Sequence, residues 1–242
     1  HNKCGFCYQG DKQEPHMTLD DFMFLIDMAK DHVNQVALGG RGDPNHHPDF
    51  IKILEYCREN NIVPNYTTSG IGLKDEHVEA SKMCGAVAVS DYEREFTYDA
   101  LNSFINARIK TNIHMIFSRS NFDKIKKILY GYNPWIDRLG KSAPRTERFD
   151  IRKLNAVIFL LFKPVGRGEN IPELYPTNEE IELFSSLIKT PKSSFKIGMD
   201  SCLVNQISKI RELSPIEKVC MDTCESSRMS AYVTPDLRLI PC

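Results

Sequence analysis

The chain has 242 residues, enough for one large domain whose apolar core needs no covalent cross-links. Its 31 basic and 32 acidic residues nearly cancel, which argues against a nucleic acid as the main partner, because phosphate binding requires clustered Lys and Arg. No apolar run reaches the roughly 20 residues of a membrane span, and no signal peptide is visible, so no membrane partner is expected. The eight cysteines fit a reduced, cytoplasmic protein better than a secreted one.

The hydrophobic pattern predicts helices and strands that alternate along the chain. The first helix, over 18–32, begins at Thr18 and has two aspartates in its first turn. Strands are expected over 35–38, 62–67, 86–89, 112–117 and 156–162, and helices over 48–60, 75–83, 98–109 and 122–130. The strands are short and apolar without alternation, so both faces should be covered, as in parallel sheets with right-handed crossovers.

The pattern changes after the fifth predicted strand. A helix capped by Thr177 is expected to run to Ile188, and a further strand is expected over 195–199. A hairpin with its turn at Pro235 is predicted near the end of the chain. The long segment 131–153 interrupts the alternation, which favours a loop over the mouth of the fold, with a disordered surface excursion as the alternative.

Glycine and hydroxyl residues follow the predicted strands. They form Gly-Gly-Arg-Gly-Asp-Pro over 39–44, Thr-Thr-Ser-Gly over 67–70 and Ser-Asp over 90–91. In parallel barrels the chemistry lies at the carboxyl ends of the strands, where these residues would gather. The sequence therefore predicts an α/β protein, with a barrel favoured over a doubly wound sheet.

Cys4 and Cys7 form a Cys-x2-Cys pair at the start of the chain. Two thiolates at this spacing can bind one metal centre, because the short turn between them directs both sulfurs inward. Zinc sites, iron–sulfur clusters and thioredoxin-like redox pairs all use this spacing. The polar run after the pair is typical of a loop, which disfavours the redox pair because that pair would begin a helix.

Together with the glycine turn, the cysteine pair resembles the cluster motif of radical S-adenosylmethionine (SAM) enzymes, Cys-x3-Cys-x2-Cys followed by an aromatic residue. The first cysteine of that motif would lie immediately before His1. The turn over 39–44 resembles the family's Gly-Gly-Glu-Pro, with an insertion and with Asp43 in place of glutamate. The resemblance implies a partial (β/α)6 TIM-like barrel, which we expect over 1–190.

The resemblance also assigns roles to individual residues. Cys4 and Cys7 would bind a [4Fe–4S] cluster and would be the catalytic residues. The predicted SAM-binding residues are Phe6, Tyr8, Gly39, Gly40, Asp43, Thr68, Ser69, Ser90 and Arg167. The alternatives are turn and cap roles for the hydroxyls and simple solvent exposure for Arg167.

A second group of cysteines lies in the region 191–242. Cys220 and Cys224, followed by Cys242 after a hairpin, resemble the start of the SPASM or Twitch modules that hold auxiliary clusters. Leu237 stands where the hairpin turn of those modules has glycine. Cys202 is a further candidate ligand, and the remaining ligands are expected beyond residue 242. We therefore predict an auxiliary iron–sulfur region over 191–242, with zinc as the alternative metal.

The resemblance implies an enzyme that reductively cleaves SAM to a 5′-deoxyadenosyl radical, which abstracts hydrogen from a substrate. A peptide or protein side chain is the expected substrate, as in the maturation of ribosomally made peptides, and a flavodoxin or ferredoxin is the expected reductant. The alternatives are a small molecule or an enzyme's side chain as substrate, a tRNA-modifying enzyme, and a zinc-stabilised, non-catalytic binding protein.

Overall fold

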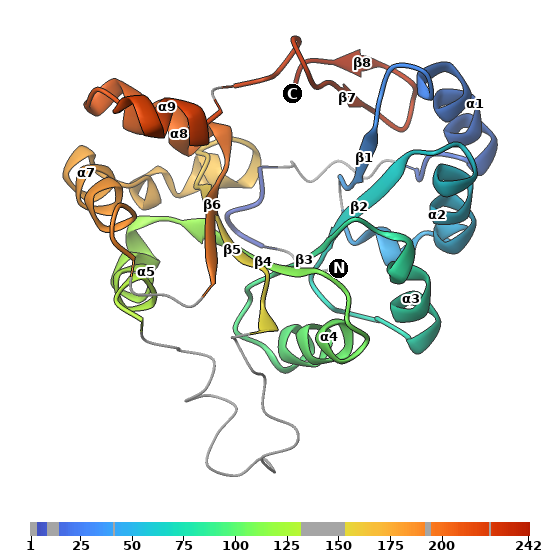
Figure 1. The fold of residues 1–242 in the computed structure, drawn as a ribbon, viewed down its shortest axis with the longest axis horizontal. Helices are drawn as coiled ribbons and strands as arrows, with labels where there is room; N and C mark the ends of the chain where they lie inside the picture. The colour runs from blue at the N-terminus through green and yellow to red at the C-terminus, as the bar shows by residue number, and fades with distance from the viewer. Residues whose placement is uncertain (1–3, 9–14, 41, 132–152, 192–194, 223) are drawn as a thin grey trace. The chain divides into compact units, whose positions relative to one another are not determined.

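The computed structural model describes residues 4–8, 15–40, 42–131, 153–191, 195–222 and 224–242 (Figure 1). Nearly all of the predicted loop over 131–153 lies outside these ranges. The contacts divide the chain into two compact units. Unit 1 consists mainly of 12–113 and 230–242, and unit 2 of 2–11 and 114–229.

One six-stranded sheet follows the chain in strict order. Its strands are β1 (Gln35–Leu38), β2 (Val63–Thr68), β3 (Val87–Ser90), β4 (Thr111–Phe117), β5 (Ala156–Leu161) and β6 (Lys196–Met199), adjacent in that sequence. The pairs β1–β2, β2–β3 and β5–β6 are parallel. A doubly wound sheet reverses its strand order at a switch point, whereas this order does not reverse. The predicted parallel α/β fold with flanking helices is confirmed.

In unit 1 the helices pack on β1–β3. They are α1 (Leu19–Ala29), α2 (Phe50–Glu59), α3 (Asp75–Ala80) and α4 (Glu95–Asn106), with short 3-10 turns η1 (Pro44–His46) and η2 (Ser81–Met83). The Thr18 hydroxyl accepts a hydrogen bond from Asp21 N at 3.1 Å, so the predicted N-cap is confirmed. Phe22 and Ile26 of α1 pack with Ile53 and Cys57 of α2 in a buried cluster.

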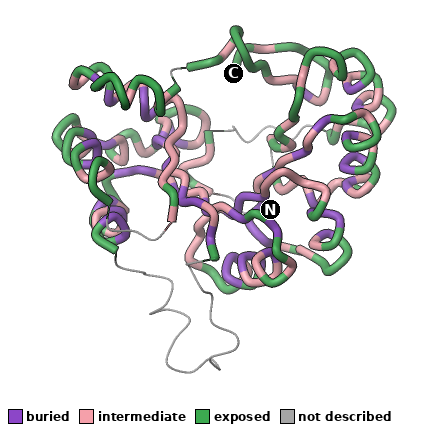
Figure 2. Tube along the Cα trace, in the orientation of Figure 1, coloured by how far each residue is buried: buried purple, intermediate pink, exposed green. Residues whose placement is uncertain are grey.

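Unit 2 has a core of stacked aromatic rings. Phe117 lies 4.8 Å from Phe184 in a stacked pair, and Phe184 meets Phe159 edge to face at 5.2 Å. The helical elements are η3 (Arg119–Asn121), α5 (Phe122–Leu129), η6 (Gly166–Asn170), η7 (Pro172–Leu174), α7 (Asn178–Leu187), α8 (Ser201–Ile210) and α9 (Pro215–Cys220). Burial is greatest in strands such as β3 and β5, whereas β1 and β6 at the two ends of the strand order contain only partly buried and exposed residues (Figure 2).

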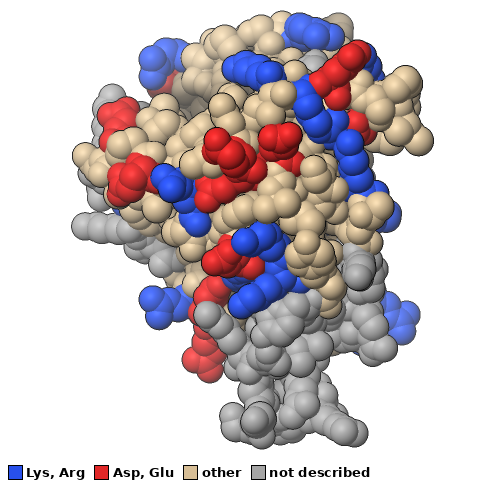
Figure 3. All heavy atoms as spheres, turned by 90° about the vertical axis from the view of Figure 1, so that its left-hand side faces the viewer, with Lys and Arg blue, Asp and Glu red and all other residues tan. Residues whose placement is uncertain are grey.

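The predicted C-terminal hairpin is present in unit 1. Strands β7 (Tyr232–Val233) and β8 (Leu239–Ile240) pair in antiparallel fashion. Acidic and basic side chains are interspersed on the face of the molecule drawn in Figure 3. Among the described helices, none combines the length and the apolar character needed to cross a bilayer.

Candidate cluster and nucleotide site

The glycine turn after β1 lies in unit 1. Gly39 is exposed and Gly40 partly buried. Gly40 has φ +125° and Gly42 has φ +91°, backbone conformations that residues with a Cβ rarely adopt. Arg41, between them, lies outside the described residues. The turn therefore requires glycine at two positions. At the carboxyl end of β1 it presents backbone that has no Cβ atoms at these positions.

Asp43 joins this turn to the one after β2. Its Oδ1 accepts a hydrogen bond from Ser69 N at 2.9 Å, and its Oδ2 accepts one from Ser69 Oγ at 2.5 Å. The structure thus brings together two residues that the sequence predicted separately. Because both carboxylate oxygens bind Ser69, the pair fixes the position of the glycine turn relative to the end of β2.

Thr68 and Asn45 form a second link between the same turns. The Thr68 side chain is 1% exposed, donates to Asn45 Oδ1 at 2.8 Å and accepts from Gly70 N at 2.9 Å. Asn45 in turn donates to Ile71 O at 3.3 Å. Sequence reasoning missed Asn45, although it directly follows the Asp-Pro of the glycine turn. With these partners, Thr68 and Ser69 hold the backbone that would face a ligand.

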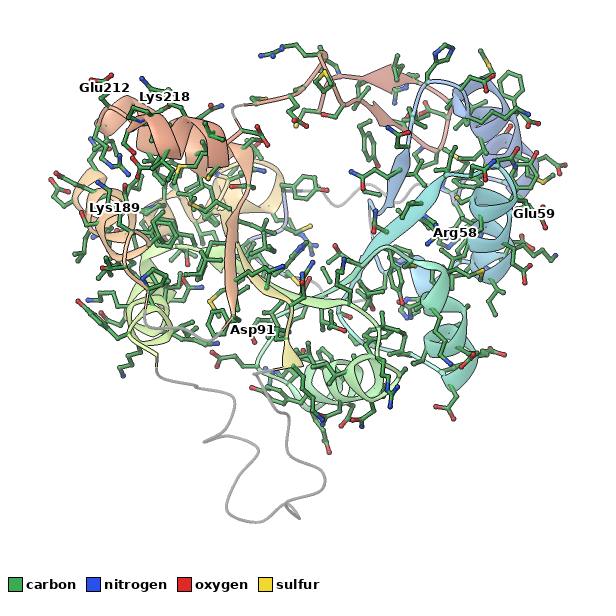
Figure 4. All side chains as sticks on the ribbon, viewed as in Figure 1. Arg58, Glu59, Asp91, Lys189, Glu212 and Lys218 are labelled. Atoms are coloured by element: carbon green, nitrogen blue, oxygen red, sulfur yellow. The ribbon has the colours of Figure 1, made fainter. Side chains whose placement is uncertain are left out.

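The third predicted turn follows β3. Ser90 ends the strand and is partly buried. The Oδ1 of the next residue, Asp91, accepts a hydrogen bond from Glu93 N at 3.1 Å, and Glu93 has φ +53° (Figure 4). The Asp91 side chain therefore shapes a tight turn immediately after the strand.

The cysteine loop lies in unit 2. Cys7 N donates to Cys4 O at 3.2 Å, which closes a tight turn, and both cysteines are partly buried and form no disulfide. Phe6 is partly buried, whereas Tyr8 is 55% exposed. Arg167 N, in the segment after β5, donates to Cys7 O at 3.0 Å. The predicted residue Arg167 thus contacts the cysteine loop through its backbone.

A charged cluster that sequence reasoning missed lies at the ends of β5 and β6, also in unit 2. Lys163 Nζ is 3.3 Å from Asp200 Oδ2, and Asp200 Oδ1 accepts hydrogen bonds from Leu161 N and Leu203 N at 3.1 and 3.0 Å. The Asp200 carboxylate therefore ties the end of β5 to the start of α8. Lys163 and Asp200 each directly follow a predicted strand. They could therefore have been predicted as candidates in the same way as Ser69 and Ser90, from their position at the carboxyl end of a strand.

Burial and neighbouring charges alter the pKa values of Lys163 and His114 in this cluster. Burial alone would lower the pKa of Lys163, but the Asp200 carboxylate and the Cys202 thiol beside it raise that pKa above its ordinary value. Burial lowers the pKa of His114, on β4, to about 4, against the opposing effect of Asp200. At neutral pH the cluster therefore contains a charged lysine and a neutral histidine.

The predicted auxiliary cysteines lie in two helices and two irregular segments, and they belong to both units. Cys202 lies in the first turn of α8 and is partly buried; Cys220 ends α9 and is exposed; Cys224 and Cys242 are exposed. Across the described ranges, no three or more His, Cys, Asp or Glu side chains are grouped so as to hold a metal ion. The auxiliary cluster stays a prediction.

Cys57 is buried and Cys84 is partly buried. Burial raises the pKa of Cys57 to about 11 and that of Cys84 to about 12. At neutral pH both thiols therefore favour the protonated form, whereas the thiolate is the nucleophile and the metal ligand.

The sequential parallel sheet with flanking helices is like the fold of radical SAM enzymes, and the solved structures similar to it include SuiB and anSMEcpe. Two are SuiB from Streptococcus suis, one bound to S-adenosylmethionine (TM-score 0.69) and one to the precursor peptide SuiA (TM-score 0.70). Both are 16% identical to this chain and are matched over 99% of it. A third is native anSMEcpe with AdoMet and the Kp18Cys peptide, at TM-score 0.65, 12% identity and 99% coverage of this chain.

The chain spans 57% and 56% of the two SuiB chains and 70% of the anSMEcpe chain. No protein-family model matches the sequence, and no curated protein matches it. The resemblance to radical SAM enzymes is therefore confirmed at the level of the fold.

Proposed function

We propose that this protein is a radical SAM enzyme whose Cys4 and Cys7 bind a [4Fe–4S] cluster. The observation that carries the proposal is the tight Cys4–Cys7 turn, whose thiols form no disulfide and which accepts the hydrogen bond from Arg167 N to Cys7 O, in a fold of the radical SAM type. The motif that the chain resembles has a further cysteine ahead of Cys4, which would supply the third ligand.

The residues present fit both cofactors. Cys4 and Cys7 supply the soft sulfur donors that iron–sulfur clusters use, on a turn too short for either thiol to move far from the other. Gly40 has φ +125° and no Cβ, so the turn after β1 can present its backbone to the amino group of SAM. When bound, the cluster and SAM would supply the radical chemistry that removes hydrogen from an unactivated carbon.

The chain itself would bind, orient and shield the reactants. Asp43 with Ser69, and Thr68 with Asn45, would fix the backbone around the nucleotide. The Lys163–Asp200 pair places a charged ammonium group at the carboxyl end of β5, where it would orient a polar group of the substrate. Phe6 and Tyr8 would contribute apolar surface beside the cluster.

We further propose a peptide or protein side chain as the substrate. Two structures with this fold hold peptides, SuiB with the precursor SuiA and anSMEcpe with Kp18Cys, which supports a peptide here. An auxiliary iron–sulfur site that includes Cys202, Cys220, Cys224 or Cys242, and a flavodoxin or ferredoxin as electron donor, complete the proposal.

Anaerobic reconstitution of the full-length protein with iron and sulfide tests the cluster. We expect bound iron and a broad visible charge-transfer band, and we expect the double variant C4A/C7A to lose about four irons per chain, because a [4Fe–4S] cluster cannot form on one thiolate. Metal analysis by mass spectrometry together with the absorbance spectrum provides the measurement.

Cys57→Ala is the matched control, since Cys57 is fully buried in the apolar core cluster between α1 and α2, away from the cysteine loop in sequence and in a different unit. The C57A variant should keep the iron content of the wild type. Zinc in place of iron, with no visible band, would contradict the proposal and would favour a zinc-stabilised binding protein.

A further inference from the structure

The C-terminal hairpin reaches the glycine turn within unit 1. In β7 and β8, Tyr232 pairs with Ile240 and Val233 with Leu239. The connecting turn is closed by Thr234 N donating to Arg238 O at 2.9 Å, and Arg238 Nε donates to Asp236 Oδ2 at 2.7 Å. Short, multiply bonded turns of this kind fix the strands that they join. The hairpin therefore holds Tyr232 in a defined position.

Tyr232 approaches the glycine turn at Gly40. A Cβ added to Gly40 would lie 3.1 Å from the Tyr232 hydroxyl oxygen, closer than ordinary van der Waals contact. A Cβ added to the neighbouring Gly39 would have no atom within 4 Å. The atom that approaches Gly40 is the polar tip of the tyrosine. No local pattern connects these two residues, which lie near opposite ends of the chain.

We propose that Tyr232 is a positioning residue for the nucleotide site, acting through Gly40. The inference rests on the proposed function, in which the backbone of this turn binds the amino group of SAM. Gly40 has φ +125°, and a glycine loses more conformational freedom on ordering than any other residue. A hydroxyl packed against it restricts the turn before the ligand arrives, so less entropy is lost on binding.

Titration calorimetry of SAM into anaerobically reconstituted, full-length protein tests the role of the hydroxyl. Y232F removes the oxygen nearest Gly40 and keeps the ring. We expect the dissociation constant of Y232F to rise about 2- to 12-fold, the range for one polar contact, with the iron content per chain unchanged. The control L239A changes an exposed residue on the other strand of the same hairpin and should bind within about twofold of the wild type.

A double-mutant cycle separates positioning from a general structural effect. G40A alone should weaken SAM binding, because its Cβ would meet the Tyr232 hydroxyl and its φ is unfavourable for alanine. In the Y232F background the oxygen is gone, so the further loss caused by G40A should be smaller than in the wild type. G39A, whose Cβ meets nothing, should cause the same loss in both backgrounds.

The outcomes distinguish this inference from the proposed function. If the wild type binds SAM while Y232F binds equally well and the cycle is additive, Tyr232 has no positioning role and only the inference falls. If the wild type with its cluster does not bind SAM, the proposed function is contradicted, and so is the inference that rests on it. The inference is supported if Y232F binds SAM more weakly than the wild type, if the effects of Y232F and G40A are non-additive, and if those of Y232F and G39A are additive.

Discussion

Single residues decide whether the strand-end turns can form. Gly70 follows the hydroxyl pair Thr68 and Ser69 and has φ +94°. A Cβ at this position would lie 2.4 Å from Phe96 O and 2.8 Å from Ala100 Cβ, both in α4. Gly70 is therefore required both by its backbone conformation and by the close approach of a helix.

Replacing Gly70 by alanine should destabilise the fold by at least about 1–3 kcal/mol from backbone strain, and the contact with Phe96 O adds to this cost. Urea unfolding followed by circular dichroism provides the measurement. G39A serves as the control, because Gly39 is exposed and its Cβ would meet nothing. Equal midpoints for G70A and G39A would show that the turn tolerates a side chain.

Residue types alone indicated where the strand-end turns lie but not how their side chains pair. The hydroxyls and glycines after the predicted strands correctly marked the turns after β1 and β2. Nothing in the sequence showed that Asp43 would bind Ser69 with both oxygens, since a side-chain pair depends on the spacing of two strands. The role of Tyr232 could not be predicted from the sequence for the same reason, because its approach to Gly40 depends on the tertiary structure.

At the scale of elements, a bidentate ion pair between Arg211 and Glu217 joins α9 to the end of α8. Arg211 donates through Nη1 and Nη2 to the two Glu217 oxygens, at 2.9 and 2.5 Å. The Ser214 backbone N–H also donates to Glu217 at 2.9 Å. The Arg211 hydrogen bonds and the Ser214 backbone hydrogen bond lower the pKa of Glu217 to about 2.

A folded-state pKa below the unfolded value stabilises the fold above the unfolded pKa, and this stabilisation is lost as the pH falls toward the folded pKa. The contribution of Glu217 should thus be complete above about pH 4.5 and decrease progressively toward about pH 2. The E217Q variant should have a lower melting temperature than the wild type at neutral pH. Between about pH 4.5 and about pH 2, its melting temperature should fall less steeply than that of the wild type. Thermal melts at several pH values within this window provide the measurement.

Glu212→Gln is the matched control, since Glu212 pairs with Lys218 at 3.3 Å on the surface and its side chain is 88% exposed (Figure 4). Exposed pairs contribute little to stability, so E212Q should behave as the wild type. A pH profile of E217Q that parallels the wild type would contradict the assigned role of Glu217.

Most elements were predictable because their signals are local. The Thr18 cap and the bounds of β1 agree with the sequence, and the strand predicted over 195–199 is present as β6 (Lys196–Met199), paired with β5. Helix α9 was missed although its signal is local too, since Ser214 and Glu217 form a capping box with Pro215 in the first turn. Element ends were less predictable: the predicted helix over 75–83 changes to a 3-10 turn at Ser81.

At the scale of the whole molecule, the candidate residues belong to both units. The glycine turn and the hairpin lie in unit 1, whereas the cysteine loop, the Lys163–Asp200 pair and α8 lie in unit 2. Within each unit, parallel strands place the turns that follow them at the same edge of the sheet. The account of function therefore depends on the cysteine loop and the glycine turn serving one reaction.

The formation of 5′-deoxyadenosine from SAM tests that claim most directly. Reconstituted full-length protein, reduced chemically without oxygen, should form 5′-deoxyadenosine and methionine, as measured by liquid chromatography and mass spectrometry. The C4A/C7A variant should form neither, whereas C57A should match the wild type. Iron-loaded wild type that forms no more 5′-deoxyadenosine than C4A/C7A would contradict the account.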